Sequence, residues 1–261
     1  MMNRIDRLFE NRKTGILSVF MTAGYPQLED TVPLLQALET HGADMVEVGI
    51  PFSDPLADGP VIQQSSQVAL ENGMSLKLLF DQLKGIREKV HLPLLLMGYL
   101  NPIFKMGMET FLDRCREVGI DGVIIPDLPA SEFEEKYRSM FAAHGIHHVM
   151  LVSPHTSDER VRKIAGLSGG FLYMVSEAST TGTRGSVKSH QVAYFNRIRE
   201  MNLPVPGLIG FGISNRETFL TACSHASGAI IGSAFIKAIG GEGKLENNVK
   251  QFLEMILENQ C

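Results

Sequence analysis

Residues 45–63 read M-V-E-V-G-I-P-F-S-D-P-L-A-D-G-P-V-I-Q, an apolar run followed by a loop rich in carboxylates and prolines. The run Met45–Ile50 is largely apolar and β-branched, which predicts a short strand that is buried on both faces, as in a parallel sheet. Glu47 interrupts this run. A buried carboxylate is costly unless it is paired, solvated in a cleft or held with a raised pKa, so Glu47 is a candidate functional residue. The alternative is a strand-end glutamate that pairs with a nearby arginine or lysine.

The loop after this strand carries Asp54 and Asp58 among three prolines, Pro51, Pro55 and Pro60. Each proline fixes its own φ and favours extended backbone at the residue before it. We therefore expect a partly pre-ordered loop that presents its carboxylates, and the alternative is a merely polar connection.

Composition limits the possible functions. The 261 residues are 44% hydrophobic and 20% charged, which suits one globular domain, residues 1–261, near the roughly 250 residues of a (β/α)8 barrel. The net charge is −5 and the basic residues are scattered, so nucleic acid is not an expected partner. No apolar run approaches the roughly 18 residues of a membrane span, and the start lacks the apolar core of a signal peptide. We expect a soluble, cytoplasmic protein without a membrane partner.

Metal and disulfide sites are not predicted. Cys115, Cys223 and Cys261 are far apart and show no C-x-x-C spacing, which argues against a disulfide framework and a zinc site. His155 is the only histidine near a predicted strand end, and a lone loop histidine is more often a hydrogen-bonding residue than a metal ligand. We therefore expect no metal site.

The chain alternates predicted strands and helices after an N-terminal helix that ends near Asn11. The predicted strands are residues 15–22, 45–50, 92–100, 122–125, 148–152, 171–175, 205–210 and 229–232. The predicted helices are residues 28–41, 63–72, 75–89, 110–118, 131–144, 157–165, 190–201, 215–222, 235–239 and 245–258. Ser131 and Glu134 are expected to form a capping box that opens the helix 131–144.

About eight βα units in 261 residues favour a closed barrel over an open doubly wound sheet. The predicted fold class is therefore α/β, a (β/α)8 TIM barrel with an extra N-terminal helix. Chemistry in such barrels takes place at the carboxyl ends of the strands. No lysine lies in or just after a predicted strand, which argues against an aldolase that forms a Schiff base.

Glycines follow the seventh and eighth predicted strands, at Gly210, Gly212 and Gly232, and Ser233 follows the last of them. Glycines let backbone N–H groups approach an anion, and a helix that begins at Ser233 would add its N-terminal dipole. This pattern predicts a phosphorylated ligand. The alternative is a pair of tight turns that the barrel geometry requires.

Two further features near strand ends can each be interpreted in two ways. The loop 176–189 is polar, rich in small residues and long enough to close over a site, or it is an ordinary surface loop. Tyr173 could support a substrate by hydrogen bonding, or it could be a core aromatic residue whose hydroxyl is satisfied.

The stretch V-E-V-G-I-P-F-S-D-P-L-A-D-G-P-V-I-Q resembles the signature of the tryptophan synthase alpha chain family. The resemblance extends over nearly the whole chain, through M-T-A-G-Y-P at 21–26, Y-L-N-P-I-F at 99–104 and D-L-P at 127–129. It implies a lyase that cleaves indole-3-glycerol phosphate to indole and glyceraldehyde 3-phosphate in tryptophan biosynthesis. Glu47 and Asp58 are then the catalytic pair.

The resemblance also assigns binding residues. It implies that Gly210, Gly212, Gly232 and Ser233 bind the substrate phosphate, with Gly182 nearby, and that Thr181 closes towards Asp58. Phe20, with Ile62 and Leu100, is expected to form an apolar wall for the indole ring. Tyr173 is expected to support the substrate.

The resemblance further implies a partner, a pyridoxal-phosphate-dependent beta chain in an α2β2 complex, with the cofactor in the partner and none in this chain. The sequence predicts an exposed apolar patch at the catalytic face, formed by Phe52, Leu56, Ile103, Phe104 and Leu128. Two other functions stay open. One is a phosphosugar isomerase, which would need a lysine or histidine electrophile, and the other is an inactive alpha-like subunit that only activates its partner.

Overall fold

The computed structural model describes residues 2–176, 189–210 and 212–257. In these residues, eight parallel strands pair in chain order and form a closed barrel. The strands are β1 Ile16–Thr22, β2 Met45–Gly49, β3 Leu94–Met97, β4 Gly122–Ile124, β5 His147–Val152, β6 Leu172–Val175, β7 Gly207–Gly210 and β8 Gly228–Ile231. Pairing of β1 with β8, which sets Ile16 opposite Gly228, closes the barrel. The predicted (β/α)8 barrel is confirmed.

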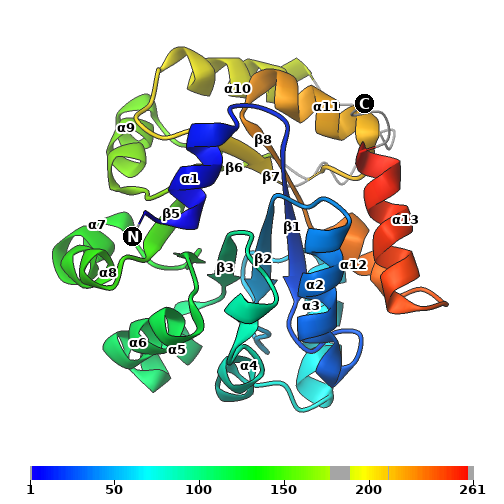
Figure 1. Cartoon of the computed structure of the whole chain (residues 1–261). Coiled ribbons are helices and arrows are strands. Elements are labelled where there is room, and N and C mark those ends of the chain that lie inside the picture. Colours follow the sequence, from blue (N-terminus) through cyan, green and yellow to red (C-terminus); the bar gives the residue numbers. More distant parts are fainter. Residues whose placement is uncertain (1, 177–188, 211, 258–261) are drawn as a thin grey trace.

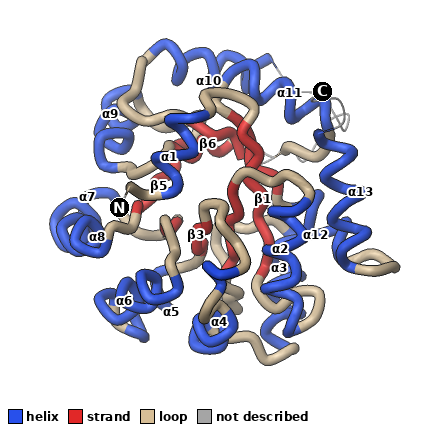
Figure 2. The backbone as a smooth tube through the Cα atoms, viewed as in Figure 1, coloured by secondary structure: helices blue, strands red, loops and turns tan. Residues whose placement is uncertain are grey.

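Helices surround the barrel, and Figure 2 shows them as a ring outside the strands. They are α1 Arg4–Asn11, α2 Thr31–Thr40, α3 Pro60–Glu71, α4 Leu76–Gln82, α5 Leu100–Met106, α6 Met108–Val118, α7 Ala130–Glu132, α8 Arg138–His144, α9 Asp158–Leu167, α10 Ser189–Glu200, α11 Arg216–His225, α12 Ser233–Ile239 and α13 Leu245–Leu257. Short 3-10 helices at Leu28–Asp30 and Ile86–Glu88 accompany these α-helices, and Phe133–Tyr137 forms a π-helical turn between α7 and α8.

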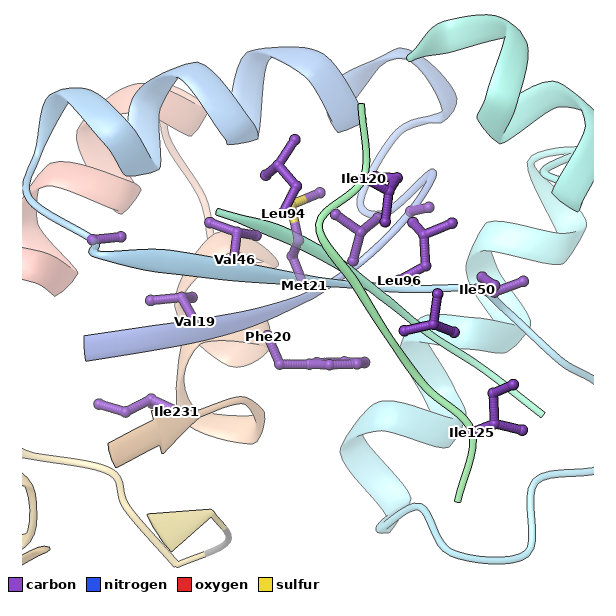
Figure 3. Packing of buried hydrophobic residues seen from close by; sticks show 14 of the residues in the cluster. Val19, Phe20, Met21, Val46, Ile50, Leu94, Leu96, Ile120, Ile125 and Ile231 are labelled. Atoms are coloured by element: carbon purple, nitrogen blue, oxygen red, sulfur yellow. The ribbon is translucent and has the colours of Figure 1, made fainter. Parts of the chain in front are cut away.

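Each strand contributes to two cores, because successive side chains of a strand point to opposite faces. In β1, Ile16 packs inside the barrel, whereas Leu17, Val19 and Met21 pack between the barrel and its helices. Figure 3 shows that the side chains of Phe20 and Met21 project from opposite faces of β1. All residues of β2 are buried, as its apolar pattern predicts.

The extra N-terminal helix is α1, and it closes one end of the barrel (Figure 1). Ile5 and Phe9 are buried in the inner cluster, and the ring of Phe9 lies 6.0 Å from that of Phe171. The carboxylate of Asp6 lies 2.8 Å from the ring of His147, the first residue of β5. This end is therefore the amino-terminal end of the strands, which leaves the carboxyl-terminal mouth for the site.

Two predicted boundaries are wrong. Ser131 and Glu134 form no capping box, because α7 already begins at Ala130, and Pro129 precedes it without a side-chain cap. The predicted strand 92–100 ends at Met97, and the chain then enters α5, a helix that was not predicted. Pro102 lies in the first turn of α5, where a proline costs no hydrogen bond.

Candidate active site at the carboxyl ends of the strands

Glu47 lies on β2, opposite Phe20 of β1 and Leu95 of β3, and is fully buried. The Ser18 hydroxyl donates a hydrogen bond of 2.9 Å to Oε1. The other oxygen, Oε2, has no hydrogen-bond partner among the described residues. Burial raises the pKa of Glu47 to about 8, although the bond from Ser18 acts in the opposite direction. The carboxyl group is therefore mostly protonated at neutral pH, and it can both give and take a proton.

Asp58 lies in the loop before α3 and is half-buried. The Tyr99 hydroxyl donates a hydrogen bond of 3.0 Å to its carboxylate, and the same hydroxyl accepts one of 2.9 Å from the Ala57 backbone N–H. The Gln63 side chain also donates to the Asp58 carbonyl, at 2.8 Å. Burial raises the pKa of Asp58, and the Tyr99 hydrogen bond opposes that rise. Tyr99 therefore holds the loop at two points beside its carboxylate.

No role is predicted for Tyr99 from the sequence, although it lies at the end of the predicted strand 92–100. Burial raises its own pKa to about 12, so it stays a hydrogen-bond donor at neutral pH. The ring of Phe52 packs against the Tyr99 ring at a centroid distance of 5.3 Å. A tyrosine at the mouth of a predicted barrel is the sequence signal that could have identified it.

Tyr173 is buried inside the barrel mouth with the two carboxyl groups. Its pKa is raised well above the usual value by burial, and also by the negative charges of Glu47 and Asp58. The charge interactions with both acids mean that the three side chains share one region. A Cβ atom on Gly210 would overlap the Tyr173 ring and hydroxyl, so the absence of a side chain at Gly210 makes room for Tyr173.

The glycine loops lie at the same mouth. Gly210 ends β7, and its carbonyl accepts hydrogen bonds of 3.0 Å from the backbone N–H and the hydroxyl of Ser176. Gly212 has a φ of +74°, a left-handed conformation that favours glycine. The close approach of Tyr173 to Gly210 and the left-handed backbone of Gly212 give both glycines a structural reason, whether or not an anion binds.

Gly232 joins β8 to α12, and a Cβ atom there would lie 3.4 Å from Phe20 and 3.6 Å from Ile62. The predicted apolar wall and the predicted phosphate loop are therefore neighbours. The first backbone hydrogen bond of α12 runs from Ile236 N–H to the Gly232 carbonyl, at 3.0 Å. The N–H groups of Ser233 and the two following residues precede that bond, so they are available to an anion within the helix geometry.

Two predicted binding residues, Thr181 and Gly182, lie outside the described residues. The predicted apolar patch is partly wrong. Leu56 and Phe104 are 87% and 67% exposed, but Ile103 and Leu128 are buried. Ile103 turns onto the core because α5 is a helix, and the helix directs neighbouring side chains to different faces.

A cavity of about 360 Å³ lies away from these carboxyl groups, at the amino-terminal end of the strands. Its lining includes Lys13, Thr14, Gly207, Cys223 and Ser227, but no carboxylate. The Lys13 ammonium there donates to the Phe9 carbonyl at 2.6 Å, which satisfies the end of α1. This cavity is not the candidate site. Among the described residues, no cluster of three metal-binding side chains occurs, and no helix is long and apolar enough to cross a membrane.

Comparison with known proteins identifies the family of the chain. A family model described as "Tryptophan synthase alpha chain" matches residues 7–260. The tryptophan synthase alpha chain of Flavobacterium psychrophilum is 52% identical over 257 residues, which cover 98% of this chain and 99% of the relative. The structure of the tryptophan synthase alpha subunit of Legionella pneumophila has a TM-score of 0.89 at 34% identity, covering 98% of this chain and 97% of that chain. The tryptophan synthase complex of Pyrococcus furiosus has a TM-score of 0.85 at 34% identity, covering 94% and 98%.

Proposed function

Because the chain belongs to the tryptophan synthase alpha chain family, whose members cleave indole-3-glycerol phosphate in tryptophan biosynthesis, we propose that Glu47 and Asp58 carry out this carbon–carbon cleavage. The products are indole and glyceraldehyde 3-phosphate. The observation that carries the proposal is the buried Glu47 carboxyl, which has one oxygen bound to Ser18 and the other without a partner among the described residues. A pKa of about 8 gives this group the proton that the reaction needs.

The cleavage uses the two carboxyl groups in different ways. The Glu47 acid donates its proton to C3 of the indole ring, and the Asp58 carboxylate binds the ring N–H, where positive charge develops. The bond between C3 and the side chain then breaks, and its electrons return to the ring. The hydroxyl on the released carbon gives its proton to the Glu47 carboxylate as the aldehyde forms. Glu47 is thereby protonated again, so the step needs no other acid or base.

The remaining binding residues have complementary roles in this proposal. Gly212, Gly232 and Ser233 bind the substrate phosphate through backbone N–H groups, and Gly210 borders that site. Phe20 forms part of the wall for the indole ring, which its proximity to Gly232 supports. Tyr173 supports the substrate between the two acids. The roles of Thr181 and Gly182, in loop 177–188, stay predictions from the family resemblance.

We also propose that the chain works in an α2β2 complex with a beta chain that holds pyridoxal phosphate, while this chain holds no cofactor of its own. The Pyrococcus furiosus relative is named as a tryptophan synthase complex, and exposed Leu56 and Phe104 offer apolar surface at the mouth. A cytoplasmic location and a single domain over residues 1–261 accompany this proposal.

Substitution of the two acids tests the proposal. Glu47→Gln and Asp58→Asn should each lower kcat for indole release at least about a hundredfold, because each removes an acid–base or charge-stabilising group. Circular dichroism should remain that of the wild type. Asp113→Asn, an exposed carboxylate on α6, is the matched control and should keep full activity. A folded Glu47 or Asp58 variant with wild-type kcat would remove that residue from the mechanism.

The same assay addresses the alternative of an inactive alpha-like subunit. Indole release is measured for the chain alone and with a cognate beta chain. Activity of the chain alone, or its appearance with the beta chain and its loss in Glu47→Gln, supports catalysis here. An unchanged rate in the complex of Glu47→Gln would assign the reaction elsewhere.

A further inference from the structure

We propose that Ser18 is a positioning residue for Glu47, and that its hydroxyl determines which carboxyl oxygen delivers the proton to the substrate. The inference rests on the proposed function, because it concerns the same proton transfer. Ser18 does not touch the reacting atoms in this proposal, and it acts through Glu47 alone.

The geometry of the barrel brings these two side chains together. Ser18 lies in β1, where it is opposite Met45 of β2 and Ile230 of β8, and Phe20 is opposite Glu47. Ser18 and Glu47 are both fully buried, and their hydrogen bond measures 2.9 Å. The side chains of Ile16, Met45 and Ile230, in the same part of the barrel, are apolar. Ser18 is therefore a polar group in an apolar interior, and among the described residues its hydroxyl binds Glu47.

The Ser18 hydrogen bond distinguishes the two oxygens of the carboxyl group. Oε1 accepts a hydrogen bond from the Ser18 hydroxyl, which favours Oε2 as the oxygen that carries the proton of neutral Glu47. Oε2 has no other partner among the described residues. The last side-chain torsion of a glutamate is broad, so without Ser18 the carboxyl group could rotate and exchange its two oxygens. Ser18 thus fixes the acid in the orientation that presents Oε2.

The same hydrogen bond also affects acidity. A donor to a carboxylate favours the ionised form, and the bond from Ser18 opposes the rise in the pKa of Glu47 that burial causes. Without the hydroxyl, the pKa should rise further. Glu47 would then be a weaker acid towards the indole carbon, as well as a less well oriented one.

The test compares wild type with Ser18→Ala in indole release between about pH 6 and 10. Ser18→Ala should lower kcat about tenfold at neutral pH and leave KM nearly unchanged, because Ser18 does not contact the substrate. The alkaline limb of kcat/KM should move to higher pH by about one unit, which a loss of stability alone would not produce.

Ser168→Ala is the matched control. Ser168 is also a buried serine. Its hydroxyl donates a hydrogen bond of 2.6 Å to the Phe171 carbonyl and accepts one of 2.9 Å from the Met150 N–H. It lies just before β6, at the end of the barrel that is closed by α1. Its loss should reduce stability without moving the alkaline limb.

A second measurement does not require activity. Carboxyl carbon NMR of protein labelled at the glutamate side chains follows Glu47, whose signal is identified by its absence in Glu47→Gln. The Glu47 signal should titrate near pH 8 in wild type and at higher pH in Ser18→Ala. An unshifted titration together with an unshifted alkaline limb would overturn the role of Ser18. Absence of indole release from wild type would instead refute the proposed function, and the NMR titration would still measure the coupling of Ser18 to Glu47.

Discussion

Two buried acids differ in how the protein compensates their burial. Asp121, which is 4% exposed, accepts hydrogen bonds from Arg4 at 3.0 Å, from Arg87 at 2.6 Å and from the Leu94 N–H at 3.0 Å. Among the described residues, Glu47 has the Ser18 hydroxyl as a hydrogen-bond donor and no cation beside it, and burial raises its pKa to about 8. The two arginines form structural ion pairs with Asp121. Glu47 has no such pairing among the described residues, so it stays a carboxylic acid with one oxygen available for chemistry.

Loss of the Tyr99 hydroxyl should change both the position and the pKa of Asp58. Tyr99→Phe removes both the donor to the Asp58 carboxylate and the acceptor for the Ala57 N–H. The loop should lose its alignment, and kcat/KM for indole release should fall about tenfold. The Tyr99 bond lowers the pKa of Asp58, so its loss should raise that pKa and move the acid limb of the pH profile to higher pH. An unchanged acid limb would show that Tyr99 only supports the loop backbone.

The buried side chain of His148 should make the folded chain less stable at low pH. Both ring nitrogens lack partners among the described residues, the ring stacks on Phe133 at 4.3 Å, and burial lowers its pKa from 6.5 to about 3. The unfolded chain therefore binds a proton below about pH 6.5, where the folded chain does not. Stability falls as the pH decreases through this window, towards the folded pKa, and it is regained as the pH rises.

His148→Leu should remove this dependence. At pH 5, the wild type should have lost about 2 kcal/mol more of its free energy of unfolding, relative to pH 7, than the variant has. Urea denaturation at a series of pH values measures the difference, with exposed His91→Leu as the control. Parallel pH curves for wild type and His148→Leu would mean that the imidazole has the same pKa in the folded and unfolded chains.

The proposed reactive residues could be selected from the sequence more readily than the residues that support them. Glu47 could be selected because a carboxylate in a buried strand conflicts with its surroundings, and Asp58 because the family signature contains it. The bonds from Ser18 and Tyr99 join residues 29 and 41 positions apart in the chain. They depend on strand register and on the path of a loop, and no local pattern in a single sequence specifies either.

At the level of elements, the alternation of strands and helices was predictable because apolar runs and amphipathic segments differ in period. The residues at which helices begin were less predictable. Helix α3 begins at Pro60, three positions before the predicted start at residue 63, and α5 contains Pro102 in its first turn. Proline removes a hydrogen bond inside a helix but not in its first turn, and the sequence alone does not say which applies.

The attachment of α1 to the barrel depends in part on an ion pair with Asp121. Asp121 lies just before β4 and binds Arg4 of α1 and Arg87, whose side chain is 17% exposed. Asp121→Ala should lower the free energy of unfolding by about 3 kcal/mol, because it leaves a largely buried arginine without its carboxylate. Asp81→Ala, which breaks an exposed pair with Lys84, is the control and should leave the urea midpoint unchanged. Equal midpoints for both variants would show that the ion pair with Asp121 does not stabilise the attachment of α1.

At the scale of the whole molecule, the two ends of the barrel differ. Helix α1 fills the amino-terminal end with Ile5 and Phe9. The carboxyl-terminal mouth carries the two acids and, beside them, Leu56 and Phe104, the most exposed large apolar side chains of the described residues. Exposed apolar side chains next to a site favour a contact with a partner that also covers the site. A beta chain docked there would receive indole, an apolar product, without its release into solvent.

Substitution at the mouth tests this arrangement. Leu56→Asp and Phe104→Asp should each weaken binding of a cognate beta chain at least about tenfold, because each places a charge in an apolar contact. Titration calorimetry measures the affinity, and the rate of indole release without the partner should stay at the wild-type level. Leu220→Asp on α11, where the side chain is 48% exposed, is the matched control for an added surface charge. If all three variants bind the beta chain as tightly as wild type does, the partner docks on another face, and the mouth must open to solvent during turnover.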